Sequence, residues 1–158
     1  MMELITTTKN QCVLASFAMV MQTTMDHLGG RLGHDGLDRV LDDTAEPHCF
    51  RSFHPQEFID LLMKDGFAVT MVELYPCLNH GGQLVNHAEF LGEDRFFQSL
   101  LYGDGVIFGT TKSMGHAVAW NREEARIYDP RGYKYEWNKE QDFVPRQFFL
   151  IQKVEEHV

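Results

Sequence analysis

The pattern of apolar residues along the chain predicts an α+β fold, with N-terminal helices packed on a C-terminal antiparallel sheet. Helical spacing of apolar residues dominates the N-terminal part, whereas short apolar segments separated by polar turns dominate the chain after Gly105. This order differs from the alternation of helices and strands that builds a parallel sheet. The 158 residues contain no internal repeat and no linker-like stretch, so we expect one domain over residues 1–158.

The first predicted element is a central helix from about Cys12 to His27. Its apolar residues cover nearly the whole circumference, which indicates that the helix is buried on all sides. The glycine pair at 29–30 suits its C-terminal end. A short second helix is predicted over 37–41, where apolar residues recur at helical spacing.

The middle of the chain predicts a third helix followed by a strand. Pro55 suits the first turn of a helix, apolar residues mark one face of the segment after it, and Gly66 ends it. Residues 67–72 then have the composition of a strand. Residues 76–92 contain several glycines and are interpreted as a long loop with a short strand at 83–85.

A fourth helix is predicted from Glu93 to about Gly103, because apolar residues recur between them at helical spacing. The rest of the chain predicts the antiparallel sheet. Its strands are expected at residues 106–109, 117–120, 126–128 and 147–151. Residues 121–124 form the polar turn that joins the second and third of these strands.

Composition and charge exclude several classes of function. The formal net charge is −9 and basic residues are scattered, which argues against a nucleic acid or an anionic membrane surface as partner. No segment has the run of about 18 apolar residues that spans a membrane, and the N-terminus does not resemble a secretory signal. The three cysteines, Cys12, Cys49 and Cys77, are an odd and low count that fits a reducing compartment. We therefore expect a cytoplasmic protein.

Three residues far apart in the sequence have the layout of a thiol-nucleophile triad. Cys12 stands where a polar opening gives way to the buried helix, and a helix N-terminus stabilises the thiolate, the reactive form of cysteine. His116 lies on a predicted strand between small neighbours, which would not crowd its ring. Asp129 ends the next strand, where it can accept a hydrogen bond from the imidazole and orient it. The alternative for Cys12 is a small apolar core residue, because free cysteine is among the most buried residue types.

A zinc site is a weaker alternative. Its conceivable ligands in the middle of the chain are His48, Cys49, His54, Cys77 and His80. A structural zinc site usually needs two closely spaced ligand pairs, and only Cys77 and His80 have such a spacing here. We therefore expect neither a metal nor another cofactor.

Several segments resemble the bacteriocin-processing, double-glycine peptidases and their stand-alone relatives. Residues 11–20 resemble the cysteine motif of that family, in which an alanine follows three residues after the cysteine and Ala-Met about six after it. Residues 115–118 are similar to the family's histidine strand, and residues 127–132 resemble its Asp-Pro element. Residues 54–67 also match the family's middle helix and the strand after it, so the similarity spans roughly residues 6–152.

The resemblance implies a papain-like cysteine peptidase fold, in which a buried central helix carries the cysteine. It also implies that Cys12 is the nucleophile, that His116 is the general base and that Asp129 orients the histidine. The expected function is that of a cytosolic thiol hydrolase acting on a peptide or amide bond of a peptide or protein substrate. Glutamine deamidation and acyl transfer are related reactions of the same machinery.

One position departs from the family pattern. Family members commonly carry a glutamine six residues before the cysteine, where its amide helps to bind the oxyanion, and this chain has Thr6 there. Thr6, Asn10 or Gln11 could supply a donor beside the backbone N–H of Cys12. Loss of one such donor typically lowers the rate about a hundred- to a thousandfold.

This departure leaves other functions open. The chain could be a catalytically weak or inactive module that binds a peptide or a partner protein in its cleft. It could also be an inhibitor or interaction protein that acts by surface contact, which the charge of −9 permits. The sequence names neither the substrate nor the oligomeric state.

Overall fold

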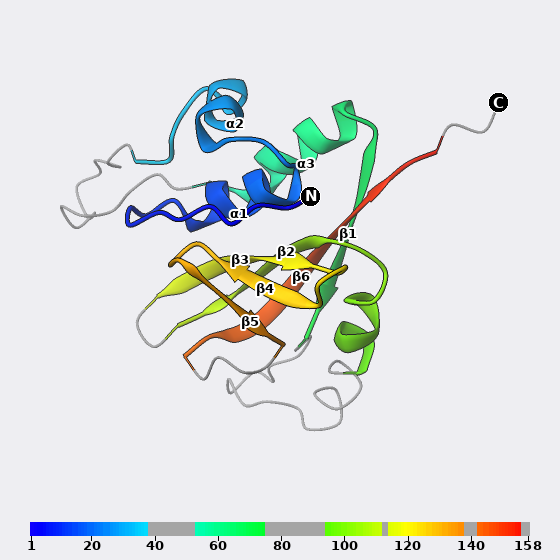
Figure 1. Ribbon diagram of the computed structural model, residues 1–158. Coiled ribbons are helices and arrows are strands. Elements are labelled where there is room, and N and C mark those ends of the chain that lie inside the picture. The colour runs from blue at the N-terminus through cyan, green and yellow to red at the C-terminus, as the bar shows by residue number, and fades with distance from the viewer. Residues whose placement is uncertain (38–52, 75–93, 112–113, 138–141, 156–158) are drawn as a thin grey trace, which may run out of the picture.

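The computed structural model shows an α+β arrangement, as the sequence predicts (Figure 1). The structure describes residues 1–37, 53–74, 94–111, 114–137 and 142–155. Within them, helices α1, α2 and α3 lie on one side of a six-stranded antiparallel sheet (Figure 1). Most of the sheet comes from the C-terminal part of the chain, and one strand comes directly after α3.

Helix α1 (Cys12–Val20) is the buried central helix that the sequence predicts. Its residues from Leu14 to Val20 are all buried, and it packs mainly on β3 (Gly115–Asn121). The apolar residues around its circumference therefore pack into a hydrophobic core that surrounds the helix. This burial leaves the first turn, with Cys12, as the part of α1 that reaches the surface.

A turn separates α1 from α2 (Met25–Leu32), where the apolar pattern predicts a single helix to His27. Gln22 has a φ of 55°, in the left-handed region, and this conformation breaks the helix. Thr24 then starts α2, because its Oγ1 accepts a hydrogen bond from the His27 N–H at 3.1 Å. The prediction of one long helix is wrong because apolar residues keep the helical spacing through the turn.

Helix α3 (Pro55–Lys64) begins as the sequence predicts. The side chain of His54 accepts from the N–H of Gln56, and Glu57 accepts from the N–H of His54 at 2.9 Å. These two bonds form a capping box, and Pro55 occupies the first turn where its missing N–H costs nothing.

Two helices end next to glycines in the left-handed region. Gly66, with a φ of 86°, follows α3 and confirms the predicted end. Gly33, with a φ of 85°, caps α2, and its N–H donates to the carbonyl of Gly29 at 2.9 Å. The glycine pair at 29–30 lies inside α2, so the expected helix end at that pair is wrong.

The sheet has the strand order β1-β6-β2-β3-β4-β5, and all neighbouring strands are antiparallel. Its strands are β1 (Phe67–Glu73), β2 (Gly105–Thr110), β3 (Gly115–Asn121), β4 (Arg126–Asp129), β5 (Tyr133–Glu136) and β6 (Val144–Lys153). The predicted strands at 67–72 and after Gly105 are thus confirmed. Strand β5 and the first residues of β6 are present in the structure but were not predicted from the sequence.

These additions have physical reasons. Strand β5 is mostly exposed, so it lacks the apolar residues that mark a strand in sequence. Strand β6 begins before Pro145, which has no N–H to donate and lies opposite Gly109. The register between β2 and β6 shifts at Phe108/Gly109, and such an irregularity accommodates a proline in a strand.

Side chains of the central strands alternate between two cores. Ala117 and Ala119 of β3 belong to the core that contains α1, whereas Val118 and Trp120 belong to the other core. A short helix at 94–99 packs against this second core. The alternation means that both faces of β3 are covered, which fixes the position of the strand that carries His116.

Some predicted elements lie outside the described residues. These are the helix over 37–41, apart from Leu37, and the loop at 76–92 with its strand at 83–85. The fourth predicted helix is described over 94–99 and is shorter than expected, because turns follow it.

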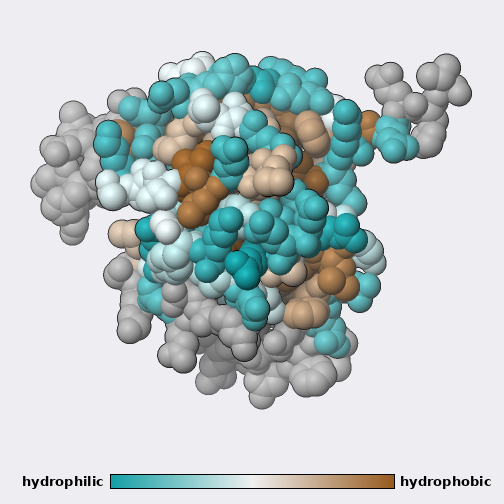
Figure 2. All heavy atoms as spheres, in the orientation of Figure 1, coloured by the Kyte–Doolittle hydropathy of each residue, from teal (hydrophilic) through white to brown (hydrophobic). Residues whose placement is uncertain are grey.

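The surface is largely polar on the face that Figure 2 shows, with hydrophobic residues gathered in a few patches. The charge of the whole chain is −9. Among the residues that the structure describes, no helix combines the length and the apolar character needed to cross a membrane.

Candidate active site

Cys12 is the first residue of α1, and its free thiol is half-buried. Gln11 precedes it at the N-cap position and makes no side-chain cap hydrogen bond. The N–H groups at the start of a helix have no carbonyl partner within the helix, and they place partial positive charge near the sulfur. Ser16 Oγ donates to the Cys12 carbonyl at 2.7 Å, which ties this first turn to the buried part of α1.

His116 is the second residue of β3, and its side chain is only 8% exposed. The ring of Phe143 packs nearly perpendicular to the imidazole, with centroids 5.7 Å apart. This packing, together with the buried strand that carries the residue, restricts rotation of the imidazole ring. Its two ring nitrogens are left to bind polar partners.

The imidazole joins the thiol to a carboxylate. Nε2 of His116 lies 2.9 Å from Oδ1 of Asp129, and the Asp129 side chain is fully buried. Cys12 lies close enough to the same imidazole to raise its pKa. Because Nε2 faces Asp129, Nδ1 is the nitrogen that meets the thiol. The structure therefore brings together the three residues of the predicted triad.

The neighbours of His116 favour its charged form. Burial by itself would lower the pKa of His116, but hydrogen bonds with Asp129 and Cys12, and attraction to their negative charges, raise it to about 9. An imidazole with this pKa is protonated at neutral pH. It can therefore form an ion pair with a thiolate at Cys12.

Asp129 is ionised although it is buried. Burial alone would raise its pKa, but hydrogen bonds from His116 and Arg131 hold the pKa of this carboxyl well below its usual range. The backbone N–H of Arg131 donates to Oδ1 at 2.9 Å, and Tyr135 donates to Oδ2 at 2.8 Å. The carboxylate thus keeps its charge next to the imidazole.

Arg131 and Tyr135 are site residues that the sequence reasoning missed. Arg131 lies two positions after Asp129, and a cation this close to the carboxylate expected to orient the histidine was a usable signal. Tyr135 carried no such signal, because only the pairing of β5 with β4 returns it to Asp129.

Cys12 and His116 open into a cleft of about 840 Å³. The residues that line it with them are Thr7, Thr8, Lys9, Asn10, Thr111, Met114, Pro130, Arg131 and Asp142. The N–H of Thr7 donates to the carbonyl of Pro130 at 2.9 Å and closes one side of the cleft. The thiol and the imidazole are therefore reachable by a molecule bound at the surface.

The two expected oxyanion donors lie elsewhere. Gln11 and Thr6 line a neighbouring hollow of about 970 Å³ and are not among the residues that line the cleft. Nε2 of Gln11 donates to the carbonyl of Asp35 at 2.9 Å, which turns this amide away from Cys12. The oxyanion role of Gln11 and Thr6 stays a prediction, and Asn10 is a nearby amide that lines the cleft.

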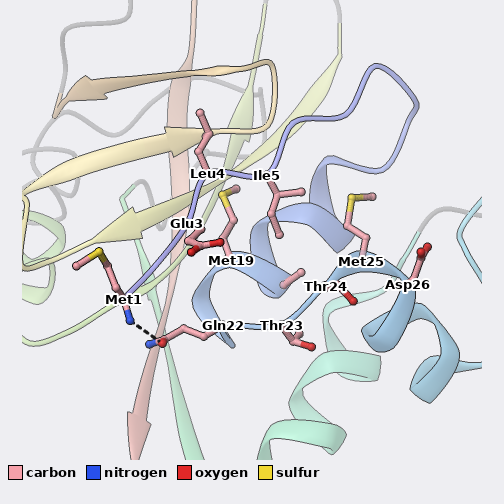
Figure 3. A pocket seen from close by; sticks show the side chains of 11 residues that line it. Met1, Glu3, Leu4, Ile5, Met19, Gln22, Thr23, Thr24, Met25 and Asp26 are labelled. Carbon is pink, nitrogen blue, oxygen red and sulfur yellow. Dashed lines mark hydrogen bonds between the residues drawn. The ribbon is translucent and has the colours of Figure 1, made fainter.

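A third hollow, of about 500 Å³, lies between the N-terminal segment and the turn after α1 (Figure 3). The amino group of Met1 donates to Oε1 of Gln22 at 2.9 Å across it. Its lining contains no cysteine and no histidine. This hollow therefore contains none of the three residues of the predicted triad.

No group of three His, Cys, Asp or Glu side chains is arranged to hold a metal ion in the part of the chain that the structure describes. Four of the conceivable zinc ligands, His48, Cys49, Cys77 and His80, lie outside the described residues. The fifth, His54, uses Nδ1 to cap α3.

No family model matches the chain, and no curated protein or solved structure matches it. The geometry of the cleft is therefore the basis for the function proposed below.

Proposed function

We propose that the protein is a papain-like thiol hydrolase that cleaves a peptide or amide bond through Cys12, His116 and Asp129. The observation that carries this proposal is the chain of contacts from a half-buried thiol at a helix N-terminus, through an imidazole, to a buried carboxylate. A buried α1 packed on an antiparallel sheet, with the thiol at its start, supports the papain-like fold.

In the proposed reaction, the sulfur of Cys12 attacks the carbonyl carbon of the scissile amide and forms a tetrahedral intermediate. The imidazolium of His116 gives its proton to the leaving nitrogen, the C–N bond breaks, and a thioester remains on Cys12. Neutral His116 then takes a proton from water as the water oxygen attacks the thioester. Release of the acid restores the thiolate beside the protonated imidazole, and Asp129 keeps the ring oriented throughout.

The oxyanion of the tetrahedral intermediate needs donors near the sulfur. The backbone N–H of Cys12 starts a helix that no described side chain caps, which supports it as one donor. Asn10 lines the cleft two residues earlier, and its amide is the proposed second donor. Asn10 thus takes the role that the family pattern assigns to a glutamine at the position of Thr6.

The cleft lining supports a peptide as the substrate class. The hydroxyl groups of Thr7, Thr8 and Thr111 offer hydrogen-bonding partners, and Met114 and Pro130 offer apolar contact. We propose a peptide or protein substrate, a cytoplasmic location, and neither nucleic acid nor membrane as partner, in line with the charge of −9.

Site-resolved alkylation tests this proposal. Iodoacetamide is applied across a range of pH, and mass spectrometry gives separate rates for Cys12, Cys49 and Cys77. We expect Cys12 to react rapidly well below about pH 8, because only the thiolate is alkylated and the imidazolium stabilises it. Equal rates and ordinary pH profiles for the three cysteines would contradict the proposal.

Variants connect this reactivity to turnover. Cys12→Ala should abolish cleavage of a peptide library that includes Gly-Gly sites, read by mass spectrometry. His27→Ala, which changes an exposed histidine that does not line the cleft, is the matched control and should leave cleavage unchanged.

A binding module is the second candidate, favoured by the position of Gln11 and Thr6 outside the cleft. Such a module would need the cleft and not the thiol. Cys12→Ser separates the two functions: it should eliminate cleavage by an enzyme, whereas a binding module would retain its affinity for peptides selected from a display library.

A further inference from the structure

Asp129 is held by more groups than its contact with His116 requires. His116 uses only Oδ1, at 2.9 Å. Arg131 contacts both oxygens, with Nε 3.2 Å from each and Nη2 2.9 Å from Oδ2. Tyr135 donates to Oδ2 at 2.8 Å. The carboxylate therefore cannot rotate about its Cβ–Cγ bond without breaking charge-assisted hydrogen bonds.

The β4–β5 hairpin builds this arrangement. Gly132, with a φ of 116°, lies in the turn, and its N–H donates to the carbonyl of Asp129 at 2.9 Å. The strand register places Tyr133 opposite Asp129 and Tyr135 two residues further along, on the same face. One tight turn thus brings Arg131 and Tyr135 back to the carboxylate that ends β4.

Arg131 is also held at its other end. Its Nη1 donates to Oδ2 of Asp142 at 2.9 Å, and its guanidinium carbon lies 5.3 Å from the centroid of the Tyr133 ring. Two carboxylates and an aromatic ring fix the plane of the guanidinium. A lysine ammonium has no such plane and could not hold both oxygens of Asp129 in the same way.

We propose that Arg131 and Tyr135 are positioning residues, which fix the Asp129 carboxylate so that His116 keeps Nδ1 directed at Cys12. This inference rests on the proposed function. A buried carboxylate with a single partner can rotate or take up a proton, and either change would release the imidazole.

The test follows two properties of the full-length chain, Cys12 alkylation by iodoacetamide and the titration of the His116 ring by NMR. In Arg131→Met, the pKa of His116, about 9 in the wild type, should fall because Asp129 no longer holds the ring. Alkylation of Cys12 at neutral pH should slow by about tenfold, because the imidazolium is no longer held beside the sulfur to stabilise the thiolate. Arg131→Lys keeps the positive charge but loses the planar guanidinium that binds both oxygens of Asp129. It should therefore restore only part of the rate of Cys12 alkylation.

Tyr135→Phe removes a single hydroxyl and keeps the ring. It should slow Cys12 alkylation by about threefold, because one hydrogen bond to Asp129 is lost. Its small change in volume makes it the decisive variant if Arg131→Met does not fold, as judged by circular dichroism and thermal unfolding.

Arg31→Met is the matched control. Arg31 makes the same two-bond contact with a carboxylate, to Asp65 at 2.7 and 2.9 Å, and it does not line the cleft. It should leave both readouts unchanged.

The outcomes separate this inference from the proposed function. If Arg131→Met and Tyr135→Phe match Arg31→Met while wild-type Cys12 reacts rapidly, the positioning role is overturned and the proposed function stands. A rise in the pKa of His116 in Arg131→Met would also overturn the positioning role. Such a rise would show that Arg131 acts on His116 only through its positive charge, which opposes protonation of the imidazole. If wild-type Cys12 reacts no faster than Cys49, the proposed function fails, and the NMR titration still reports on Arg131.

Discussion

Two histidine–carboxylate pairs in this protein share nearly the same local geometry. Nε2 of His116 lies 2.9 Å from Oδ1 of Asp129, and Nε2 of His34 lies 2.7 Å from Oε1 of Glu57. Both imidazole side chains are largely buried, with 8% and 4% of their area exposed. The two pairs cannot be distinguished by the contact between ring and carboxylate.

They differ at the other ring nitrogen. Nδ1 of His34 accepts the N–H of Gly36 at 3.1 Å, and its ring stacks on Phe53 with centroids 4.4 Å apart. His34 therefore uses Nδ1 to hold the turn within the segment after α2 and Nε2 to join that segment to α3. Nδ1 of His116 meets the thiol of Cys12 at a cleft instead. A buried histidine–carboxylate pair thus indicates a reactive site only when the second nitrogen faces a group that can react.

The largest expected effect comes from removing each histidine. His116→Ala should lower peptide cleavage by about a millionfold, to the level without a general base. His34→Ala should leave the rate of Cys12 alkylation unchanged and lower the free energy of unfolding by about 2 kcal/mol, because it removes buried hydrogen bonds. Cleavage assays and urea unfolding measure the two effects. Equal loss of activity in both variants, with both folded, would erase the distinction between the pairs.

Removing the charge of each carboxylate sharpens the comparison. Asp129→Asn keeps the shape and should lower cleavage by about ten-thousandfold, because the amide favours the wrong imidazole tautomer. Glu57→Gln should leave cleavage unchanged and weaken the contact with His34 and the capping box of α3. The kinetic constants of the two variants, measured side by side, check this expectation.

The proposed oxyanion donor gives a smaller effect. Asn10→Ala should lower cleavage by about a hundred- to a thousandfold. Gln11→Ala, which removes the bond to the Asp35 carbonyl outside the cleft, is the matched control and should leave cleavage unchanged. A larger loss in Gln11→Ala than in Asn10→Ala would show that the amide of Gln11 moves into the cleft when substrate binds.

The smallest effect concerns pH. The pKa of His116 is raised from 6.5 to about 9, so its ion pair stabilises the folded state fully below about pH 6.5. This contribution is lost as the pH rises through about 9. It amounts to about 3 kcal/mol at most. The difference in unfolding free energy between wild type and His116→Ala should therefore shrink over this range, and cleavage should fall near its upper end. A difference that is constant with pH would contradict the raised pKa.

The sequence predicted the triad because each member has a local signature. Cys12 stands at the start of an apolar helix, His116 lies between Gly115 and Ala117, and Asp129 ends a strand. Each signature depends on spacing and composition within about ten residues, which is the range over which helices and strands form. The same reasoning missed the break at Gln22, because apolar spacing continues across it.

Contacts of single side chains were not predictable in this way. Gln11 is adjacent to Cys12 in sequence, yet its amide turns to Asp35. Tyr135 lies on an exposed strand without an apolar pattern, yet it reaches the buried Asp129. The first contact joins segments 24 residues apart, and the second depends on the register between β4 and β5, which the apolar pattern does not fix.

The amino-acid sequence by itself determined the elements of this protein: a buried helix that starts with a thiol, a strand that carries a histidine, and an acid at a strand end. Only the tertiary structure decided that Cys12 lies beside His116 and that the amide of Gln11 turns to Asp35. The physical reason is distance. A hydrogen bond requires about 3 Å between specific atoms, and strand register and helix placement set that distance through contacts between segments far apart in the chain.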